Sequence, residues 1–399
     1  MITSKDAIKF IFQNITKFGD EKINTLDAVG KTLREPIQAE RDQPPFDRVT
    51  MDGIAINFDS IKQNNRNFLV SKTQFAGDSQ CTLEKKNSCV EIMTGAVLPM
   101  NTNCIIPIEQ LVKKDKSYIV NQHYQPKKYQ YIHRQGSDHK FNTLIFDIGH
   151  KIKTIDISAI LSCNKENVSV NIDPKICVIS TGNELVAAGK KILPHQIRMS
   201  NGPAILSMLK NHNYKNCEYK HLKDDKRIQY EHIEKSLNSS DIIILSGGVS
   251  MGKADYIPHV LEELGVKNIF HKIRQRPGKP MWFGVGPEDQ LVFALPGNPV
   301  STITCCRHYV IPALNLACGQ KNIIDEFVQL QKNITFKPAL TYLLPVKITN
   351  SKNGILEANP IETNTSGDFT TLIDTDGYIE LTSNKEEFNK SEILNFYRW

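Results

Sequence analysis

The spacing of hydrophobic residues predicts helices near the N-terminus. In MITSKDAIKFIFQNI the apolar residues recur at helical spacing, and Thr3 with Asp6 forms an approximate capping box before them. We interpret INTLDAVGKTLREPI as a second short helix that ends near Arg34. A further helix is expected for TIDISAILSCN, residues 154–164.

Two other regions have the short alternating pattern of strands. Residues 54–135 contain NFLVSKTQF, CVEIM, NCIIPIE and SYIVNQH, separated by Gly, Asn, Asp and Pro. This pattern predicts a small all-β module. Residues 325–399 contain NITFKP, YLLPVKIT, GILEA, GYIEL and ILNFY, and we expect strands and turns there as well.

From residue 174, apolar strands alternate with helices. The expected strands are KICVIS, CEYKHL, DIIILS, NIFHKI, MWFGV and LVFALP, and the expected helices are SNGPAILSMLKNHN, KRIQYEHIEKSLN, DYIPHVLEELG and PVSTITCCRHYVIPALNLA. We expect Asn201 to cap the first of these helices. Alternation of this kind predicts a parallel sheet with helices on both faces.

The length of 399 residues exceeds what one hydrophobic core serves, so several domains are expected. We predict an N-terminal linker and helical domain (1–45 and 136–170), a β-rich insert (46–135), an α/β domain (171–322) and a C-terminal β domain (323–399). The predicted fold class is therefore multidomain α/β plus β. Ligands of a parallel sheet bind beyond the carboxyl ends of the strands, so the chemistry is sought in the loops there.

Composition narrows the class of protein. The net charge of +6 and the pI of about 8.7 suit an anionic ligand, but without a basic stripe they do not argue for nucleic acid. Nine cysteines without metal-ligand spacing argue against zinc and against a disulfide framework, and Cys305 and Cys306 are expected to be buried thiols. We find no signal peptide and no run long enough to span a membrane, so a cytoplasmic protein is expected.

Three loops that follow predicted strands are rich in glycine or proline. They are Thr181–Glu184, Ser246–Gly252, which leads to Asp255, and Leu295–Pro299. Such turns expose consecutive N–H groups at helix N-termini and favour anions. Each loop alone is common, but together at the ends of one sheet they predict a phosphate-bearing ligand.

The segment RQRPGKP adds cations. Arg276 and Lys279 flank a rigid Pro-Gly turn that would fix the direction of their charges, whereas Arg274 is more typical of a solvated loop.

Several carboxylates are candidates with ordinary alternatives. In PPFDRVTMDGIAI, two prolines stiffen a segment that carries Asp47 and Asp52, although on this stretch alone an ordinary Asp-Gly turn is the favoured explanation of Asp52. Asp224 and Asp225 follow a strand, where one of them could cap the next helix. Thr94 lies in a Thr-Gly-Ala turn, where its hydroxyl could simply satisfy the backbone, and Asp138 in RQGSD is unremarkable on its own.

Taken in order, these motifs resemble a known family. PPFDRVTMDGIA, IMTGAVLP, RQGSD, STGNEL, SN at 200–201, LSGGVSMGKADY, RPGKP and LPGNPVS follow the order found in molybdopterin molybdenumtransferases, from about residue 5 to about 390. These enzymes insert molybdenum in the last step of molybdenum-cofactor synthesis. The chain is also similar to the C-terminal domain of gephyrin.

The resemblance implies an elongated homodimer of four-part subunits, with one α/β part similar to molybdopterin adenylyltransferase and a cleft between subunits that Asp52 reaches. It implies adenylylated molybdopterin and molybdate as substrates, a requirement for Mg²⁺, and release of AMP. Molybdopterin adenylyltransferase and molybdoenzyme apoproteins are further expected partners; nucleic acid and membrane are not.

The resemblance also implies the site residues. The acidic and hydroxyl residues are Asp52, Thr94, Asp138, Glu184 and Asp224, with Glu184 and Asp224 as magnesium ligands. The substrate- and phosphate-binding residues are Thr181, Ser246, Gly247, Gly248, Ser250, Asp255, Lys272, Arg276, Lys279, Pro296, Gly297, Asn298 and Pro299.

The chain departs from the family pattern in a few places, which leave the carboxylates intact. These places are Arg48, Val49, Thr50 and Ile54 in the first motif, Asn183 where Asp is usual, Arg276 where Lys is usual, and GSDHK in place of the common Gly-Glu-Asp. Two other functions are alternatives. A molybdopterin adenylyltransferase would look like the α/β domain alone, and an inactive gephyrin-like scaffold would be expected to lose Asp52 or Glu184.

Overall fold

The computed structural model describes residues 1–249, 255–321 and 325–399, so the predicted binding residue Ser250 lies outside the described residues. The chain divides into two compact units. Unit 1 comprises Met1–Arg34, Ile148–Lys153 and Asn167–Trp399, and unit 2 comprises Glu35–Asp147 and Thr154–Glu166. The finer division into four domains stays a prediction.

The centre of unit 1 is a six-stranded sheet in the order β16-β13-β17-β21-β20-β18. Its strands are β13 (Ile176–Thr181), β16 (Cys217–Leu222), β17 (Ile242–Ser246), β18 (Lys267–His271), β20 (Trp282–Val285) and β21 (Leu291–Leu295). The first four strands in this order are parallel, as predicted, but β20 runs antiparallel to both neighbours. The expectation of a parallel sheet was wrong for β20, because the short connection 286–290 to β21 permits only antiparallel pairing.

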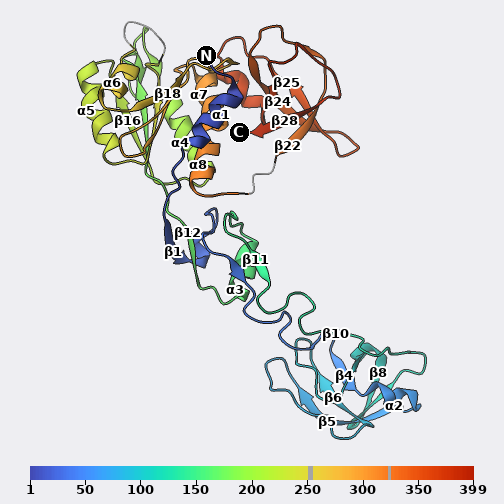
Figure 1. Cartoon of the computed structure of the whole chain (residues 1–399). Helices are drawn as coiled ribbons and strands as arrows, with labels where there is room; N and C mark the ends of the chain where they lie inside the picture. The colour runs from blue at the N-terminus through green and yellow to red at the C-terminus, as the bar shows by residue number, and fades with distance from the viewer. Residues whose placement is uncertain (250–254, 322–324) are drawn as a thin grey trace. The chain divides into compact units, whose positions relative to one another are not determined.

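Helices cover both faces of this sheet (Figure 1). One face carries α5 (Lys226–Leu237) and α6 (Ile257–Glu263), and the other carries α1 (Ser4–Gln13), α4 (Asn201–Asn211), α7 (Pro299–Cys305) and α8 (Ile311–Ala317). Side chains alternate along the strands, so Ile242 and Ile244 join one core and Ile243 the other.

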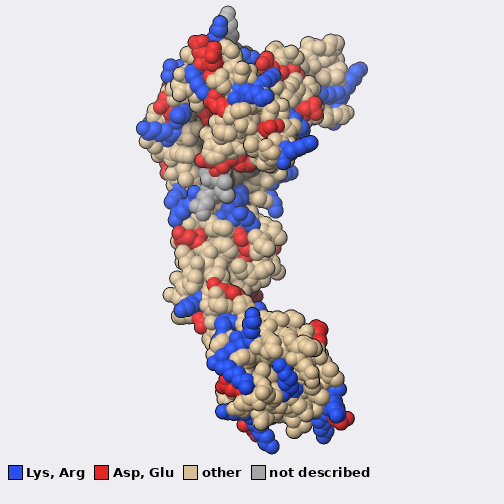
Figure 2. Space-filling view, turned by 90° about the vertical axis from the view of Figure 1, so that its right-hand side faces the viewer, with Lys and Arg blue, Asp and Glu red and all other residues tan. Residues whose placement is uncertain are grey.

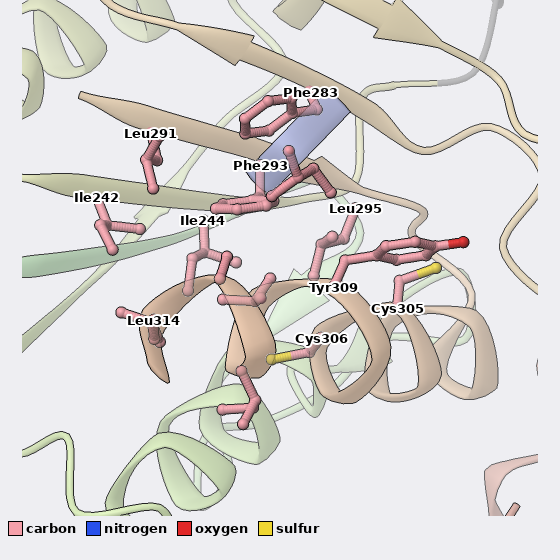
Figure 3. Packing of buried hydrophobic residues seen from close by; sticks show 14 of the residues in the cluster. Ile242, Ile244, Phe283, Leu291, Phe293, Leu295, Cys305, Cys306, Tyr309 and Leu314 are labelled. Carbon is pink, nitrogen blue, oxygen red and sulfur yellow. The ribbon is translucent and has the colours of Figure 1, made fainter. Parts of the chain in front are cut away.

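Figure 3 shows the core on the α7–α8 side, where Cys305 and Cys306 are buried free thiols, as predicted. The single long helix expected here is interrupted. A π-helical turn, η3 (Cys306–Val310), separates α7 from α8.

The N-terminal prediction was half right. The capping box of α1 is present: Thr3 Oγ1 accepts from the Asp6 N–H at 3.1 Å, and the Asp6 carboxylate accepts from the Thr3 N–H at 3.1 Å. The second predicted helix was wrong: its first residues complete β1 (Asp20–Asn24), the 3-10 turn Thr25–Asp27 follows, and the remainder forms turns and isolated bridges to Lys151 and Val170. Pairing of β1 with the distant β12 (Asn167–Asn171) overrides the local pattern.

The C-terminal strands of unit 1 close on themselves. They are β22 (Glu326–Leu330), β24 (Thr341–Asn350), β25 (Leu356–Pro360), β26 (Gly377–Leu381) and β28 (Ile393–Arg398). β24 pairs with β25 and β26, β28 pairs with β22 and β26, and β22 pairs with β25, which makes a small barrel. The short β19 (Gln275–Arg276) pairs with β24 and ties the RPGKP segment to this barrel.

Unit 2 contains the predicted β module, a sheet in the order β7-β4-β6-β5-β9-β8. Its strands are β4 (Gly53–Ile56), β5 (Asn67–Gln74), β6 (Ser88–Ile92), β7 (Cys104–Pro107), β8 (Leu111–Lys114) and β9 (Ser117–Val120), and the unit also has the short helices α2 (Phe58–Lys62) and α3 (Asp156–Ser162), the latter as predicted. A Cβ at Gly53 would lie 2.0 Å from the Ile106 carbonyl oxygen, so the strand that follows Asp52 can begin only with glycine.

The surface carries mixed charges. Lys and Arg are interspersed with Asp and Glu on the face shown in Figure 2. No helix in the described ranges has the length and apolar character needed to cross a membrane.

Candidate active site

The loops after β13, β17 and β21 line one cleft of about 800 Å³ at the carboxyl ends of these strands. Its predicted residues are Thr181, Glu184, Asp224, Ser246, Gly247, Gly248, Asp255, Pro296, Gly297, Asn298 and Pro299. Loops far apart in the sequence meet here because the carboxyl ends of parallel strands share one edge of the sheet.

Two glycines bring the main chain to the cleft. Gly247 and Gly248 have φ of +98° and +67°. A Cβ on Gly247 would lie 2.8 Å from the Thr181 carbonyl oxygen, and a Cβ on Gly248 would lie 2.8 Å from Ile257 Cγ1. Any side chain would therefore displace the loop, in addition to the strain of positive φ.

Two buried polar atoms at the cleft, Thr181 Oγ1 and Asn201 Oδ1, lack a hydrogen-bond partner within the described part of the chain. Leaving a buried polar atom unpaired costs about 1–3 kcal/mol, so the pair is suited to a ligand. Asn201 Nδ2 donates to Ser246 Oγ at 3.0 Å and to the Gly297 carbonyl oxygen at 2.7 Å, which fixes the side chain across two loops.

Sequence reasoning missed this role of Asn201. The N-cap prediction was wrong, because Ser200 occupies the cap and Asn201 is the first residue of α4. The motif SN at 200–201 was the available signal. Arg198 and Phe369 also line the cleft, and no motif pointed to them.

The carboxylates of the cleft come from three segments: Glu184 follows β13, Asp224 follows β16, and Asp255 follows β17. Asp224 Oδ2 accepts from the Asn183 N–H at 3.2 Å, and the Asp224 N–H donates to Asn183 Oδ1 at 3.2 Å. This exchange holds the loop after β13 against the loop after β16. Asn183, a departure from the family pattern, takes part both as donor and as acceptor. The following Asp225 caps α5 by accepting from the Ile228 N–H at 2.9 Å. The two adjacent aspartates thus divide the two roles that the sequence left open.

A second pocket of about 330 Å³ adjoins the cleft and shares Pro280, Pro296 and Asn298 with it. Arg276 and Lys279 line this pocket, together with the hydroxyl residues Thr363 and Ser366. Both cations are exposed, and the Arg276 guanidinium lies 5.1 Å from the centre of the Tyr342 ring. The predicted Lys272 is not among the described residues that line either pocket.

In unit 2, Asp52 and Thr94 form an exposed pair. Asp52 Oδ1 accepts from the Thr94 N–H at 2.6 Å and from the Thr94 hydroxyl at 2.7 Å. The backbone bond first, and then the hydroxyl bond, lower the pKa of Asp52 below its usual value. Both bonds fall on Oδ1, so Oδ2 is available to a ligand.

Asp138 belongs to a second exposed group. His133 Nε2 lies 2.9 Å from Asp138 Oδ1, and His133 Nδ1 lies 3.2 Å from Arg48 Nη2. Arginine can only donate, so Nδ1 accepts and Nε2–H donates to Asp138. Arg48, another departure from the family pattern, thereby orients the histidine that holds Asp138.

Asp47 holds the same region together. Its carboxylate accepts from Arg134 Nη1 at 3.0 Å and from the Gln135 N–H at 2.8 Å, which joins the PPFD segment to RQGSD. Asp52, Thr94 and Asp138 belong to unit 2, whereas Glu184 and Asp224 belong to unit 1. That all five serve one site stays a prediction.

Three protein-family models match the chain in succession. The MoeA N-terminal region (domain I and II) matches residues 2–164, a probable molybdopterin binding domain matches residues 177–316, and the MoeA C-terminal region (domain IV) matches residues 328–399. A protein of Synechocystis sp. named molybdopterin molybdenumtransferase is 34% identical over 400 residues, which cover 100% of both chains. The chain belongs to the molybdopterin molybdenumtransferase family.

Other members of the family agree with this assignment. A Haemophilus influenzae protein of the same name is 31% identical over 75% of this chain and 74% of its own. A solved structure of a molybdopterin biosynthesis MoeA protein from Pyrococcus horikoshii is 28% identical, with a TM-score of 0.81 over 100% of this chain and 99% of that chain. The resemblance drawn from the motifs and the fold class predicted from the pattern of strands and helices are confirmed.

Proposed function

We propose that this transferase of molybdenum-cofactor biosynthesis inserts molybdenum from molybdate into adenylylated molybdopterin, with release of AMP. The observation that carries the proposal is the continuity of the two pockets of unit 1, which share Pro280, Pro296 and Asn298. One pocket offers glycine turns suited to phosphate, and the other offers two cations suited to an oxyanion.

Each pocket has a distinct task in this proposal. The Gly247–Gly248 turn binds phosphate through main-chain N–H groups, while Thr181 Oγ1 and Asn201 Oδ1 receive polar groups of the same ligand. Arg276 and Lys279 hold the molybdate dianion beside it. Two substrates of like charge are thus kept close by groups from neighbouring loops.

Asp52 is proposed as a catalytic carboxylate supplied by unit 2. An aspartate is ionised at neutral pH, and the Thr94 bonds favour the ionised form further by lowering the pKa of Asp52; Oδ2 is available to orient a substrate group. We propose that the protein is a homodimer, in which unit 2 of one protomer completes the cleft of its partner. Asp138, held by His133, is proposed to act on the same side of the substrates.

Magnesium fits the carboxylates of the cleft. No group of three His, Cys, Asp or Glu side chains suited to a metal occurs among the residues that the structure describes. Mg²⁺ is commonly bound through only one or two carboxylates together with substrate phosphates, so Glu184 and Asp224 would be sufficient. When bound, the ion would neutralise the phosphate charge. A cytoplasmic location, and contacts with molybdopterin adenylyltransferase and molybdoenzyme apoproteins, complete the proposal.

The test is incubation of the pure protein with adenylylated molybdopterin, molybdate and Mg²⁺, followed by assay of released AMP and of active cofactor. We expect both products only when molybdate and magnesium are present. ATP-dependent formation of adenylylated molybdopterin would instead identify the preceding enzyme. Binding of the nucleotide without turnover under any of these conditions would favour a scaffold.

A further inference from the structure

A hydrogen-bonded series of buried polar side chains runs through unit 1 to the loop 276–279, which carries the two cations of the second pocket. Its members come from four distant segments: Ser4 of α1, His308 and Tyr309 of the π-helical turn η3, Tyr378 of β26, and Gln275 of β19. All five are at most 2% exposed. Polar groups buried this deeply must satisfy one another, and their bonds can be followed atom by atom.

The contacts form one continuous path. Tyr378 OH lies 3.0 Å from His308 Nδ1, and His308 Nε2 lies 3.2 Å from Ser4 Oγ. Ser4 Oγ lies 3.1 Å from Tyr309 OH, and the Tyr309 hydroxyl donates to Gln275 Oε1. Gln275 Nε2 then donates to the Pro277 carbonyl oxygen at 3.0 Å, inside the loop that carries Arg276 and Lys279.

The direction of every bond follows from the last one. Gln275 Oε1 can only accept, so the Tyr309 proton is committed to it, and Ser4 must donate to Tyr309. Ser4 Oγ then accepts from His308 Nε2–H, and His308 Nδ1 accepts from the Tyr378 hydroxyl. Burial lowers the pKa of His308 to about 3, so the imidazole is neutral, and the order of the bonds then requires the tautomer with its proton on Nε2.

The loop lies directly on the end of this path. A Cβ at Gly278 would be 2.3 Å from Cys305 Sγ and 2.7 Å from Gln275 Nε2, so the Pro277–Gly278 turn contacts the network without a gap. Figure 3 shows Tyr309 extending beside Cys305 at this end of the helix. His308 and Tyr309 are consecutive residues of the π-helical turn, and both contact Ser4 Oγ; such turns are frequent at functional sites.

We propose that this path is a positioning device: Tyr309 and Ser4, acting through Gln275, hold the 276–279 loop so that Arg276 and Lys279 converge on a tetrahedral oxyanion. The inference rests on the proposed function of the second pocket and adds positioning residues that touch neither substrate. Because the path ends on the loop and not on the cleft, it sets the affinity for molybdate and leaves the affinity for the pterin nucleotide unchanged.

The test compares Tyr309→Phe with Tyr214→Phe. Each change removes one buried hydroxyl that donates to a side-chain amide oxygen, since Tyr214 OH donates to Asn315 Oδ1 at 2.7 Å. Both tyrosines belong to the same core cluster, and they are 1% and 6% exposed. Only Tyr309 is connected to the loop 276–279. Both variants should therefore lose a similar amount of stability, but only Tyr309→Phe should disturb the loop.

We expect Tyr309→Phe to raise the molybdate Kd in titration calorimetry, and the molybdate KM for AMP release, about five- to tenfold, the effect of one hydrogen bond. The kcat at saturating molybdate and the Kd for adenylylated molybdopterin should stay within about twofold of wild type. Ser4→Ala should shift molybdate binding in the same direction, and it replaces Tyr309→Phe if that variant does not fold. Tyr214→Phe should leave all three quantities at the wild-type value.

Unchanged molybdate affinity in Tyr309→Phe, or an equal loss in Tyr214→Phe, would overturn the positioning role alone. Equal weakening of molybdate and of the pterin nucleotide would overturn it too. A wild-type protein that binds the nucleotide but not molybdate would overturn the assignment of the second pocket, and the positioning role with it.

Discussion

Unit 1 and unit 2 hold their candidate functional groups in different ways. In unit 1 the cleft is made by main-chain turns at strand ends, where Gly247 and Gly248 pack too closely for any side chain. In unit 2 the carboxylates stand on exposed loops, and each is held by a partner, as Asp52 is by Thr94 and Asp138 by His133. A site built from main chain is sensitive to added atoms, whereas a site built from side chains is sensitive to lost bonds.

The largest effect is expected for Asp52→Asn in unit 2. If Asp52 is the catalytic carboxylate, kcat should fall by about 10²–10⁴ while the melting temperature changes only slightly, because surface substitutions cost about 0.5 kcal/mol or less. Asp78→Asn is the matched control, since Asp78 is also an exposed aspartate of unit 2 that accepts a backbone N–H, from Phe75 at 2.8 Å. Steady-state AMP release and thermal unfolding measure the two quantities. Near-normal turnover of Asp52→Asn would show that Asp52 of unit 2 is not a catalytic residue.

Gly248→Ala should have the next largest effect. The added methyl group would meet Ile257 Cγ1 at 2.8 Å and Thr181 Oγ1 at 3.1 Å at a φ of +67°, so the loop must move. We expect the Kd for the pterin nucleotide to rise about a hundredfold, or by about 2.7 kcal/mol. Gly354→Ala introduces the same kind of strain, at a φ of +76°, with no atom within 4 Å. If the two variants bind the nucleotide equally well, the main-chain account of the cleft is wrong.

Lys279→Ala should weaken molybdate binding about tenfold at low salt, as loss of one charge-assisted contact would. The contact is exposed, so the difference from wild type should shrink as ionic strength rises. Arg274→Ala removes an exposed cation of the same segment that does not line the pocket, and it should bind molybdate normally. Titration with molybdate at several salt concentrations measures these affinities. An equal loss of molybdate affinity in both variants would indicate that the overall positive charge, and not a specific contact of Lys279, attracts molybdate.

The smallest effect is expected for Thr94→Val. It removes the hydroxyl bond to Asp52 and keeps the backbone N–H bond, so the pKa of Asp52 should rise toward its usual value. Because a lowered carboxyl pKa adds stability that is lost as pH falls through it, the variant should lose this part of its stability at a higher pH than wild type. Carbon-13 NMR titration of the Asp52 carboxyl, with Thr94→Ser as control, measures the shift. No shift in Thr94→Val would mean that the hydroxyl does not act on Asp52.

Much of the site could be predicted because it follows a rule of topology. Once β13, β17 and β21 were recognised as strands, the loops after them had to meet at one edge, and eleven of the predicted residues line that cleft. The division of labour between Asp224 and Asp225 could not be predicted, since both were suitable caps. Asp225 caps α5, and the two hydrogen bonds between Asp224 and Asn183 hold Asp224 at the cleft.

The sequence by itself determined the strands of the central sheet and of the β module, most helices, the capping box of α1 and the family motifs, because these depend on neighbours within a few residues. Only the tertiary structure decided that β20 is antiparallel, that residues 20–27 form a strand and a turn instead of a helix, and that Asn201 connects two loops. Each of these depends on contacts with distant segments. The same holds for the path from Tyr378 to Gln275. Apart from Gln275 in RQRPGKP, its residues belong to no motif, and they act together because they are buried and each donor has one possible acceptor.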